Sequence, residues 1–184
     1  MSLTKTPICN FGEKAKKFNL KSTEGKKITL EDVTGENGTL IMFICNHCPY
    51  VKAVIKEIVE DVIFLKNLGI KSAAIMSNDI KNYPEDSYKN MISFAKINSF
   101  SFPYLIDETQ MIAKDYGAVC TPDFFGYNKK LELQYRGRIR ELKDLIPVKA
   151  GDSDLKNAMK LIAKTGNGPT NQIPSMGCNI KWYK

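Results

Sequence analysis

The pattern of hydrophobic and polar positions along the chain predicts alternating strands and helices. Residues Leu40 to Ile44 form an unbroken apolar run, which is typical of a strand buried on both faces. From Val51 to Leu65, apolar residues recur at helical spacing, and charged residues take the opposite face. Pro49 fits the first turn of this helix, where the N–H group that proline lacks has no helical partner. The pattern therefore predicts a buried strand followed directly by an amphipathic helix that ends near residue 67.

The rest of the chain continues this alternation. Residues 18–22 and 27–31 are predicted to form an N-terminal β-hairpin around the turn at Glu24-Gly25. Because residues 70–76 form the next strand, the central part is a βαβ unit with a right-handed crossover. The remaining predictions are a helix over 85–98, an extended piece over 103–107, a short helix over 109–116, a hairpin of 118–127 with 131–136, and a last helix over 152–164. Residues 1–16 are predicted to be an irregular arm. Residues 170–184 form a tail with Ile180 and Trp182 as candidate anchors, which either folds back to present Cys178 or docks as an inert segment.

Length and composition indicate one globular domain. The chain has 184 residues, of which 43% are hydrophobic and 26% charged. We expect a single domain over 1–184, with a core at about 14–165 and a C-terminal tail at 166–184. No apolar run approaches the roughly 20 residues of a membrane span, and the N-terminus lacks the apolar core of a signal peptide. These features predict a cytoplasmic protein with no membrane partner.

The net charge of +7 comes mainly from lysines, which are spread along the chain among acidic residues. A nucleic-acid binder more often has a basic stripe with interleaved aromatic residues. The charge pattern therefore indicates solvated lysine faces, predicts no nucleic-acid partner and leaves the oligomeric state open.

Two cysteines lie where the buried strand ends and the helix begins. Free N–H groups and the helix dipole stabilise an anion at that position, so we expect the pKa of an exposed Cys45 to fall. His47, when protonated, adds to this effect. A thiolate attacks a disulfide, and a second thiol within reach resolves the mixed disulfide. Cys45-Asn-His-Cys48 is therefore predicted to be a redox pair in which Cys45 attacks and Cys48 resolves.

The same cysteines also fit half of a metal site. A closed zinc site needs two further ligands, which only the fold can supply from Cys9, Cys120 or Cys178. The chain has five cysteines, and an odd number argues against a structural disulfide scaffold.

The order of the predicted elements, with the two cysteines and a later Thr121-Pro122 before a hairpin, resembles the thioredoxin superfamily. More closely, the chain resembles its redoxin branch, which is related to AhpC/TSA proteins. The resemblance covers about residues 14–165 and rests on Phe43 to Cys48, Val119 to Phe125 and Tyr135 to Arg138. It implies an α/β thioredoxin-like fold, with a central mixed β-sheet flanked by helices and an N-terminal β-hairpin extension.

The resemblance also implies roles for particular residues. Cys45 would be the exposed nucleophile and Cys48 the buried resolving thiol. Pro122 would follow a cis peptide bond and pack Thr121 against the cysteine pair. Cys120 and Cys178 are candidates for additional redox roles, and inert packing is the alternative for each.

Two departures from the family pattern bear on activity. Thioredoxin has a buried carboxylate in the strand before its cysteines, and residues 40–44 have none. The Pro-x-x-x-Thr-x-x-Cys pattern of peroxiredoxins fits neither Cys45 nor Cys48, although Arg138 is a candidate for an arginine near the thiolate.

The predicted function is thiol–disulfide oxidoreductase. Its partners would be protein or small-molecule disulfides and a thiol electron donor, with no bound cofactor or metal. The alternatives are an antioxidant, thiol-dependent peroxidase and a protein that binds copper or zinc.

Overall fold

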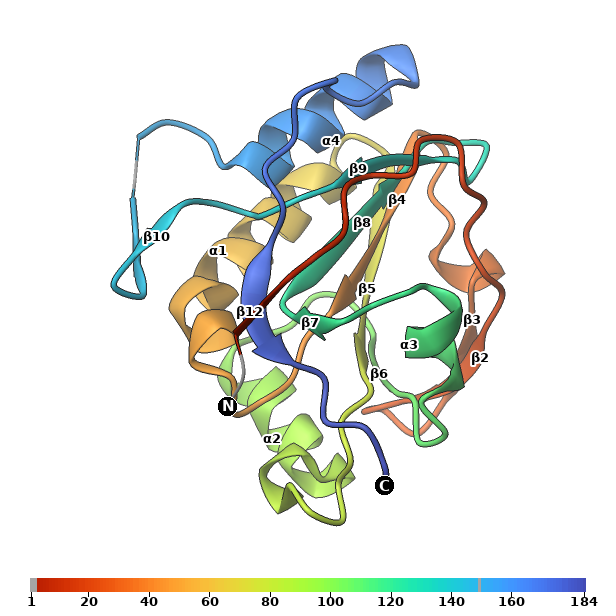
Figure 1. The fold of residues 1–184 in the computed structure, drawn as a ribbon. Helices are drawn as coiled ribbons and strands as arrows, with labels where there is room; N and C mark the ends of the chain where they lie inside the picture. Colours follow the sequence, from red (N-terminus) through yellow and green to blue (C-terminus); the bar gives the residue numbers. More distant parts are fainter. Residues whose placement is uncertain (1–2, 149) are drawn as a thin grey trace.

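A seven-stranded mixed sheet forms the centre of the molecule, as the resemblance implied. The computed structural model describes residues 3–148 and 150–184. The strand order is β3-β2-β6-β5-β4-β8-β9 (Figure 1). The strands are β2 (Asn19–Ser22), β3 (Lys27–Thr29), β4 (Gly38–Phe43), β5 (Ile70–Met76), β6 (Tyr104–Ile106), β8 (Asp123–Tyr127) and β9 (Leu133–Arg136). β4 pairs with β5 in parallel and with β8 antiparallel, so the predicted βαβ unit and the later hairpin share one sheet.

The unbroken apolar run explains why β4 lies in the middle of this sheet. Successive side chains of a strand point to opposite faces. Leu40, Met42 and Ile44 therefore enter one hydrophobic core, whereas Ile41 and Phe43 enter the other. Both faces need cover, and only a central strand receives it.

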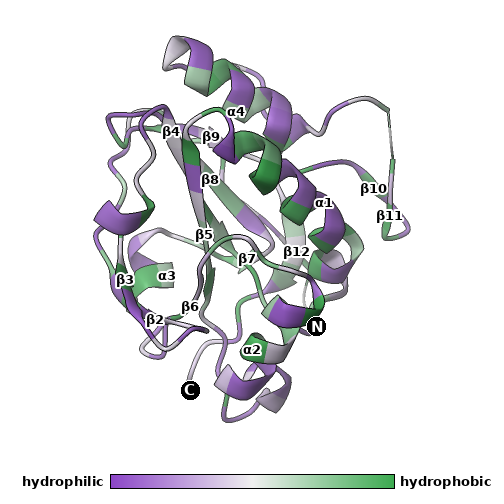
Figure 2. Cartoon of the chain, turned by 180° about the vertical axis from the view of Figure 1, so that it is seen from behind, coloured by the Kyte–Doolittle hydropathy of each residue, from purple (hydrophilic) through white to green (hydrophobic). Residues whose placement is uncertain are grey.

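Helices cover the two faces unequally. α1 (Pro49–Lys66), α2 (Tyr88–Ile97) and α4 (Asp154–Thr165) lie on one face, and the short α3 (Met111–Asp115) and a 3-10 turn (Glu31–Val33) lie on the other (Figure 1). The helices carry hydrophobic and hydrophilic residues in separate bands (Figure 2). None of the helices in the described ranges is both long and apolar enough to span a bilayer.

The predicted N-terminal hairpin is confirmed. β2 and β3 pair antiparallel, with Leu20 opposite Ile28. β2 also pairs with β6, so the hairpin extends the edge of the main sheet.

The predicted helix over 85–98 begins later than expected. Pro84–Asp86 form a 3-10 turn, and α2 starts only at Tyr88. Ser87 between them has an extended ψ of 153°, which ends one helix and starts the next. This break turns the side chain of Asp86 into the protein, where it accepts a hydrogen bond from the backbone N–H of Asn46.

The prediction of an irregular N-terminal arm is wrong for residues 3–5, and the C-terminal tail contains a strand that was not predicted. β1 (Leu3–Lys5) and β12 (Met176–Asn179) pair with each other, and β12 also pairs with β7 (Cys120–Thr121). These strands are too short for a period of two to be visible in the sequence. Their partners are distant in the chain, so only the tertiary structure brings them together. A short hairpin was likewise not predicted. Its two strands, β10 (Leu142–Lys143) and β11 (Ile146–Pro147), have two residues each and pair antiparallel.

Candidate active site

The two cysteines of the motif lie at the predicted junction. β4 ends at Phe43, and α1 begins at Pro49, with Cys48 as the residue that precedes the helix. All five cysteines are reduced, and none of them forms a disulfide. The strand positions Cys45, and the helix N-terminus positions Cys48, so that both sulfur atoms lie beside the start of α1.

Thr121 contacts both sulfur atoms. The Sγ of Cys45 lies 3.3 Å from the Thr121 hydroxyl, and the Sγ of Cys48 lies 3.2 Å from the Thr121 carbonyl oxygen. The Thr121–Pro122 peptide bond is cis, as the resemblance implied. The site thus joins residues 45–48 to residues 121–122, which are more than seventy positions apart.

The expectation of an exposed Cys45 is wrong. Cys45 is only 1% exposed and Cys48 is fully buried. Cys45 is enclosed by Cys48, by the Thr121 hydroxyl and by the side chains of one hydrophobic core. In this structure the dithiol is closed, so a substrate gains access only when neighbouring residues move.

The expected fall in the pKa of Cys45 is also not found. The hydrogen bond to Cys48 raises the pKa of Cys45, and burial and the nearby Asp86 carboxylate raise it further. The pKa of Cys48 falls to about 5, chiefly because the Cys45 thiol donates to it. Cys178 and the backbone N–H of Val51 in α1 also favour the Cys48 thiolate. The helix N-terminus therefore stabilises an anion as expected, but on the second cysteine.

Asp86 is a site residue that the sequence analysis missed. This fully buried carboxylate accepts hydrogen bonds from the Asn46 N–H at 2.8 Å, the Asn78 amide at 2.8 Å and His47 Nδ1 at 2.7 Å. It lies in the 3-10 turn Pro84–Asp86, whereas the strand of residues 40–44 has no carboxylate. No spacing in the sequence connects Asp86 to a motif forty positions earlier.

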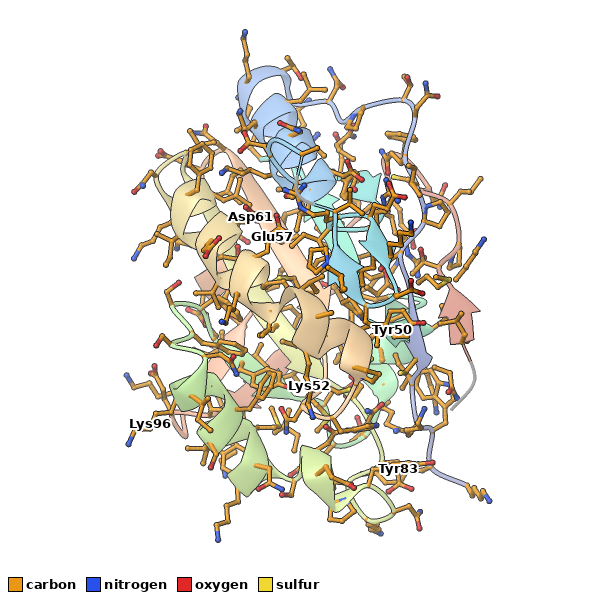
Figure 3. The ribbon with its side chains drawn as sticks, turned by 90° about the vertical axis from the view of Figure 1, so that its left-hand side faces the viewer. Tyr50, Lys52, Glu57, Asp61, Tyr83 and Lys96 are labelled. Carbon is orange, nitrogen blue, oxygen red and sulfur yellow. The ribbon has the colours of Figure 1, made fainter. Side chains whose placement is uncertain are left out.

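His47 is held on two sides. Besides the contact with Asp86, its ring stacks on Tyr83, with ring centroids 5.8 Å apart and an interplanar angle of 9°. Tyr83 lies beyond the N-terminal end of α1 (Figure 3). The hydrogen bond to Asp86 is the main reason why the pKa of His47 is raised, and the Cys48 thiolate adds to it. His47 thus favours the cationic form beside the cysteine pair.

Asn46, the other residue between the two cysteines, is held by hydrogen bonds of its side chain. The side-chain amide of Asn46 donates to the Glu85 carbonyl at 3.0 Å and accepts from the Tyr104 hydroxyl at 2.9 Å. These contacts come from β6 and from the turn before α2, so two separate segments hold the loop between the cysteines.

The structure places the two additional redox candidates, Cys120 and Cys178, differently with respect to the dithiol. Cys178 in β12 lies opposite Thr121, and its thiol hydrogen-bonds to Cys48. Cys120 precedes Thr121 in β7, so its side chain lies on the other face of that strand. The Sγ of Cys120 lies 3.9 Å from the Pro122 carbonyl oxygen. Cys178, not Cys120, shares the face of the dithiol.

One group of side chains has the composition of a metal site. Ligand atoms of Cys45, His47 and Asp86 all lie within 4.8 Å of one another. In the structure the Asp86 oxygens already accept three hydrogen bonds, and a metal ion would have to replace some of them.

A cavity of about 260 Å³ opens beside the cis proline. Its apolar wall includes Tyr50, Val54 and Pro122. Arg138 also lines it, and its Nε is paired with Asp154 at 2.7 Å. The remaining lining residues are Lys5, Ile139, Arg140, Leu142 and residues 173–176.

Comparison with known proteins supports the fold and the family. An uncharacterized conserved protein from Geobacillus kaustophilus is 38% identical, with a TM-score of 0.90, over 100% of this chain and 97% of that chain. The hypothetical protein SMc02350 from Sinorhizobium meliloti 1021 is 33% identical, with a TM-score of 0.90, over 98% of each chain.

A secreted Mycobacterium tuberculosis disulfide oxidoreductase, homologous to E. coli DsbE, shares the fold at 16% identity. Its TM-score is 0.54, over 64% of this chain and 80% of that chain. No curated protein matches this chain. Residues 11–142 match the model of the AhpC/TSA family. With a thioredoxin-like fold and a family match over most of its length, the chain belongs to the AhpC/TSA family of redox proteins.

Proposed function

We propose that the protein is a thiol–disulfide oxidoreductase in which Cys45 attacks the substrate and Cys48 resolves the mixed disulfide. The observation that carries the proposal is the contact between the two thiols at the N-terminus of α1, with Thr121 touching both. Two thiols this close form a disulfide by a small movement, which is the chemical requirement for resolution.

A shared proton reconciles the low pKa of Cys48 with attack by Cys45. The two thiols titrate as one pair, and in the reduced pair the Cys45 thiol donates to the Cys48 thiolate. Transfer of that proton leaves the charge on Cys45, which becomes the nucleophile. The cationic form of His47 stabilises the charge on either sulfur.

The reaction balances without a cofactor. The Cys45 thiolate attacks one sulfur of a substrate disulfide, forms a mixed disulfide and releases the other substrate sulfur as a thiolate. Cys48 then attacks Cys45 Sγ, forms the Cys45–Cys48 disulfide and releases the second thiolate. Cys48 loses the shared proton as it attacks. The substrate gains two electrons and this one proton, and its second thiolate takes a proton from water. A dithiol donor afterwards reduces the enzyme by the reverse exchange.

The second candidate function is binding of a soft metal, which the proximity of Cys45, His47 and Asp86 favours. Redox exchange is the better proposal, because the Asp86 oxygens already accept three hydrogen bonds and a metal ion would have to replace some of them. Stoichiometric uptake of Cu(I) or Zn(II) by the reduced protein, measured by elemental analysis, would make metal binding the better proposal.

Three earlier expectations remain part of the proposal. The partners are disulfides and a thiol donor, and the compartment is the cytoplasm. Peroxide reduction is the weaker enzyme activity because the Pro-x-x-x-Thr-x-x-Cys pattern of peroxiredoxins fits neither Cys45 nor Cys48.

Reduction of insulin disulfides by dithiothreitol tests the proposal. We expect the wild type to accelerate the reaction, and the variant Cys45→Ser to react at the uncatalysed rate. Cys48→Ser should instead accumulate a mixed disulfide at Cys45, detected by mass spectrometry. Cys9→Ser, at a cysteine remote in sequence from the motif, is the control and should keep wild-type turnover. Retained turnover in Cys45→Ser would refute the proposal.

A further inference from the structure

The C-terminal strand β12 occupies the edge of β7 beside the cis proline. Cys178 lies opposite Thr121, and Asn179 lies opposite Cys120. β12 separates β7 from β1 in their three-stranded sheet. In Figure 1, β12 runs next to the first turn of α1. β12 thus lies on β7 as an extended peptide added to a sheet edge, a common mode of peptide recognition.

The fit of β12 on β7 depends on Gly177. A Cβ at this position would lie 2.0 Å from the carbonyl oxygen of Thr121 and 3.2 Å from Pro122 Cδ. The backbone of β12 therefore comes closer to the two residues beside the dithiol than any side chain would permit.

The register directs the side chain of Cys178 to the dithiol. Residues that lie opposite each other in an antiparallel pair project to the same face. The Thr121 side chain faces Cys45, so Cys178 faces the same site. Its thiol hydrogen-bonds to Cys48, and both belong to one buried cluster with Cys45.

We propose that Cys178 is a third redox thiol, to which the Cys45–Cys48 disulfide is transferred. This inference rests on the proposed function. β12 is in effect a tethered strand that presents its cysteine to the pair. Cys178 attacks Cys48 Sγ, the Cys48–Cys178 bond forms, and the Cys45–Cys48 bond breaks. Cys45 leaves as a thiolate and takes up the proton that Cys178 loses, so no external oxidant is needed.

The transfer has a functional consequence. It returns Cys45 to the thiol form after one turnover and leaves the oxidising equivalents on a different pair. The electron donor then reduces the Cys48–Cys178 disulfide. Burial and the neighbouring Cys48 raise the pKa of Cys178 to about 12 in the reduced protein. The contribution of a Cys48 thiolate disappears once Cys48 is in a disulfide, which favours the attack at that stage.

The first test looks for the Cys48–Cys178 disulfide in a variant that cannot form the Cys45–Cys48 disulfide. The full-length variant Cys45→Ser is equilibrated in glutathione buffers that oxidise the wild type, and its disulfides are mapped by mass spectrometry. We expect a Cys48–Cys178 disulfide. The double variant Cys45→Ser/Cys178→Ser should lose it, whereas Cys45→Ser/Cys120→Ser should keep it. If Cys48 and Cys178 of Cys45→Ser remain unlinked in these buffers, the proposal is overturned.

The second test moves the strand without removing a thiol. In Cys45→Ser, the further change Gly177→Ala should push β12 off Thr121 and lower the equilibrium constant for the Cys48–Cys178 disulfide by about ten-fold or more, which is ~30 mV for a two-electron couple. An unchanged constant in the folded variant contradicts the proposed geometry. If Gly177→Ala does not fold, the mapping of Cys45→Ser still decides.

The two proposals fail separately. A wild type that forms Cys45–Cys48 and reduces insulin, while Cys45→Ser forms no Cys48–Cys178 bond, rejects the transfer alone. The variant Cys178→Ser cannot make the transfer, so the absence of a Cys45–Cys48 disulfide in oxidised Cys178→Ser rejects the oxidoreductase itself.

Discussion

His47 and Asp86 form a buried ionisable pair next to the redox thiols. His47 is 13% exposed at its side chain, and Asp86 is not exposed at all. The backbone N–H of Asn46 and the amide of Asn78 complete the environment of the carboxylate. The hydrogen bond from His47 to this carboxylate is the main cause of the raised pKa of His47, and it favours the cationic form of the ring. The pair therefore positions the loop between the cysteines and sets its local charge.

Asp86→Asn should lower the pKa of His47, because the hydrogen bond to Asp86 is the main cause of its rise. His47 is the only histidine, so its NMR titration is unambiguous. A raised folded-state pKa stabilises the protein below the unfolded value of 6.5, and this stability is lost as pH rises through the folded value. The advantage of the wild type over Asp86→Asn should shrink accordingly above about pH 6.5.

The control for this titration is Asp79→Asn. Asp79 is also a buried aspartate and lies seven positions before Asp86. Its carboxylate accepts hydrogen bonds from the Asn82 side chain and from the backbone N–H of Lys81, not from His47. The His47 titration should be unchanged in this variant. An unchanged titration in Asp86→Asn would show that the observed pair does not set the charge of the histidine.

At the scale of elements, polar groups on α1 anchor the start of α4. Glu57 and Asp61 lie one turn apart on α1, toward the segment that leads into α4 (Figure 3). Arg140 binds Glu57 at 2.7 Å, and the hydroxyl of Ser153 donates to Asp61 at 2.5 Å. The Ser153 hydroxyl also accepts from the N–H of Lys156, so it caps α4 and ties it to α1.

Ser153→Ala should reduce the free energy of unfolding by about 1–3 kcal/mol, since it removes a helix cap and leaves the buried Asp61 with one partner fewer. Urea denaturation measures the change. Ser87 is the matched control, because it precedes α2 but makes no side-chain capping bond. Ser87→Ala should change stability by less than about 0.5 kcal/mol. Equal losses in the two variants would contradict the assigned role.

At the scale of the whole molecule, the last nineteen residues belong to the packed structure. The N–H of Gly168 donates to the Gln134 side chain, and Gln172 donates to the Gln134 carbonyl in β9. Further along, the N–H of Thr6 donates to the Ser175 carbonyl, ahead of the pairing of β1 with β12. These contacts carry the tail from the end of α4, along β9, to the redox site.

Gly168→Ala should destabilise the protein by about 1–3 kcal/mol through overpacking. A Cβ at this position would lie 1.8 Å from the Gln134 carbonyl oxygen, so the tail must shift away from β9. Hydrogen exchange should show faster exchange of the β12 amides, and urea denaturation gives the energy. Thr170→Ala, at an exposed position of the same segment, is the control and should leave both measurements unchanged. Wild-type protection of β12 in Gly168→Ala would mean that this contact does not hold the tail.

The sequence by itself determined the local elements and the type of chemistry. The apolar run of 40–44 had to be central because each of its faces needs a hydrophobic partner, and the helical spacing after Pro49 placed Cys45 and Cys48 at a helix start. The turn at Glu24-Gly25 similarly predicted the β2–β3 hairpin. These conclusions depend on residues that are close together in the chain, within one or two turns of a helix or one hairpin. The pattern of such residues can be read directly from the sequence.

Only the tertiary structure decided which distant groups meet at the site. Asp86 reaches His47 because Ser87 breaks the predicted helix, and Cys178 reaches Cys48 because β12 pairs with β7. Burial of Cys45, and the shift of the low pKa from Cys45 to Cys48, follow from the same contacts. Burial and charge depend on every group within a few ångströms, and groups far apart in the sequence supply most of them here.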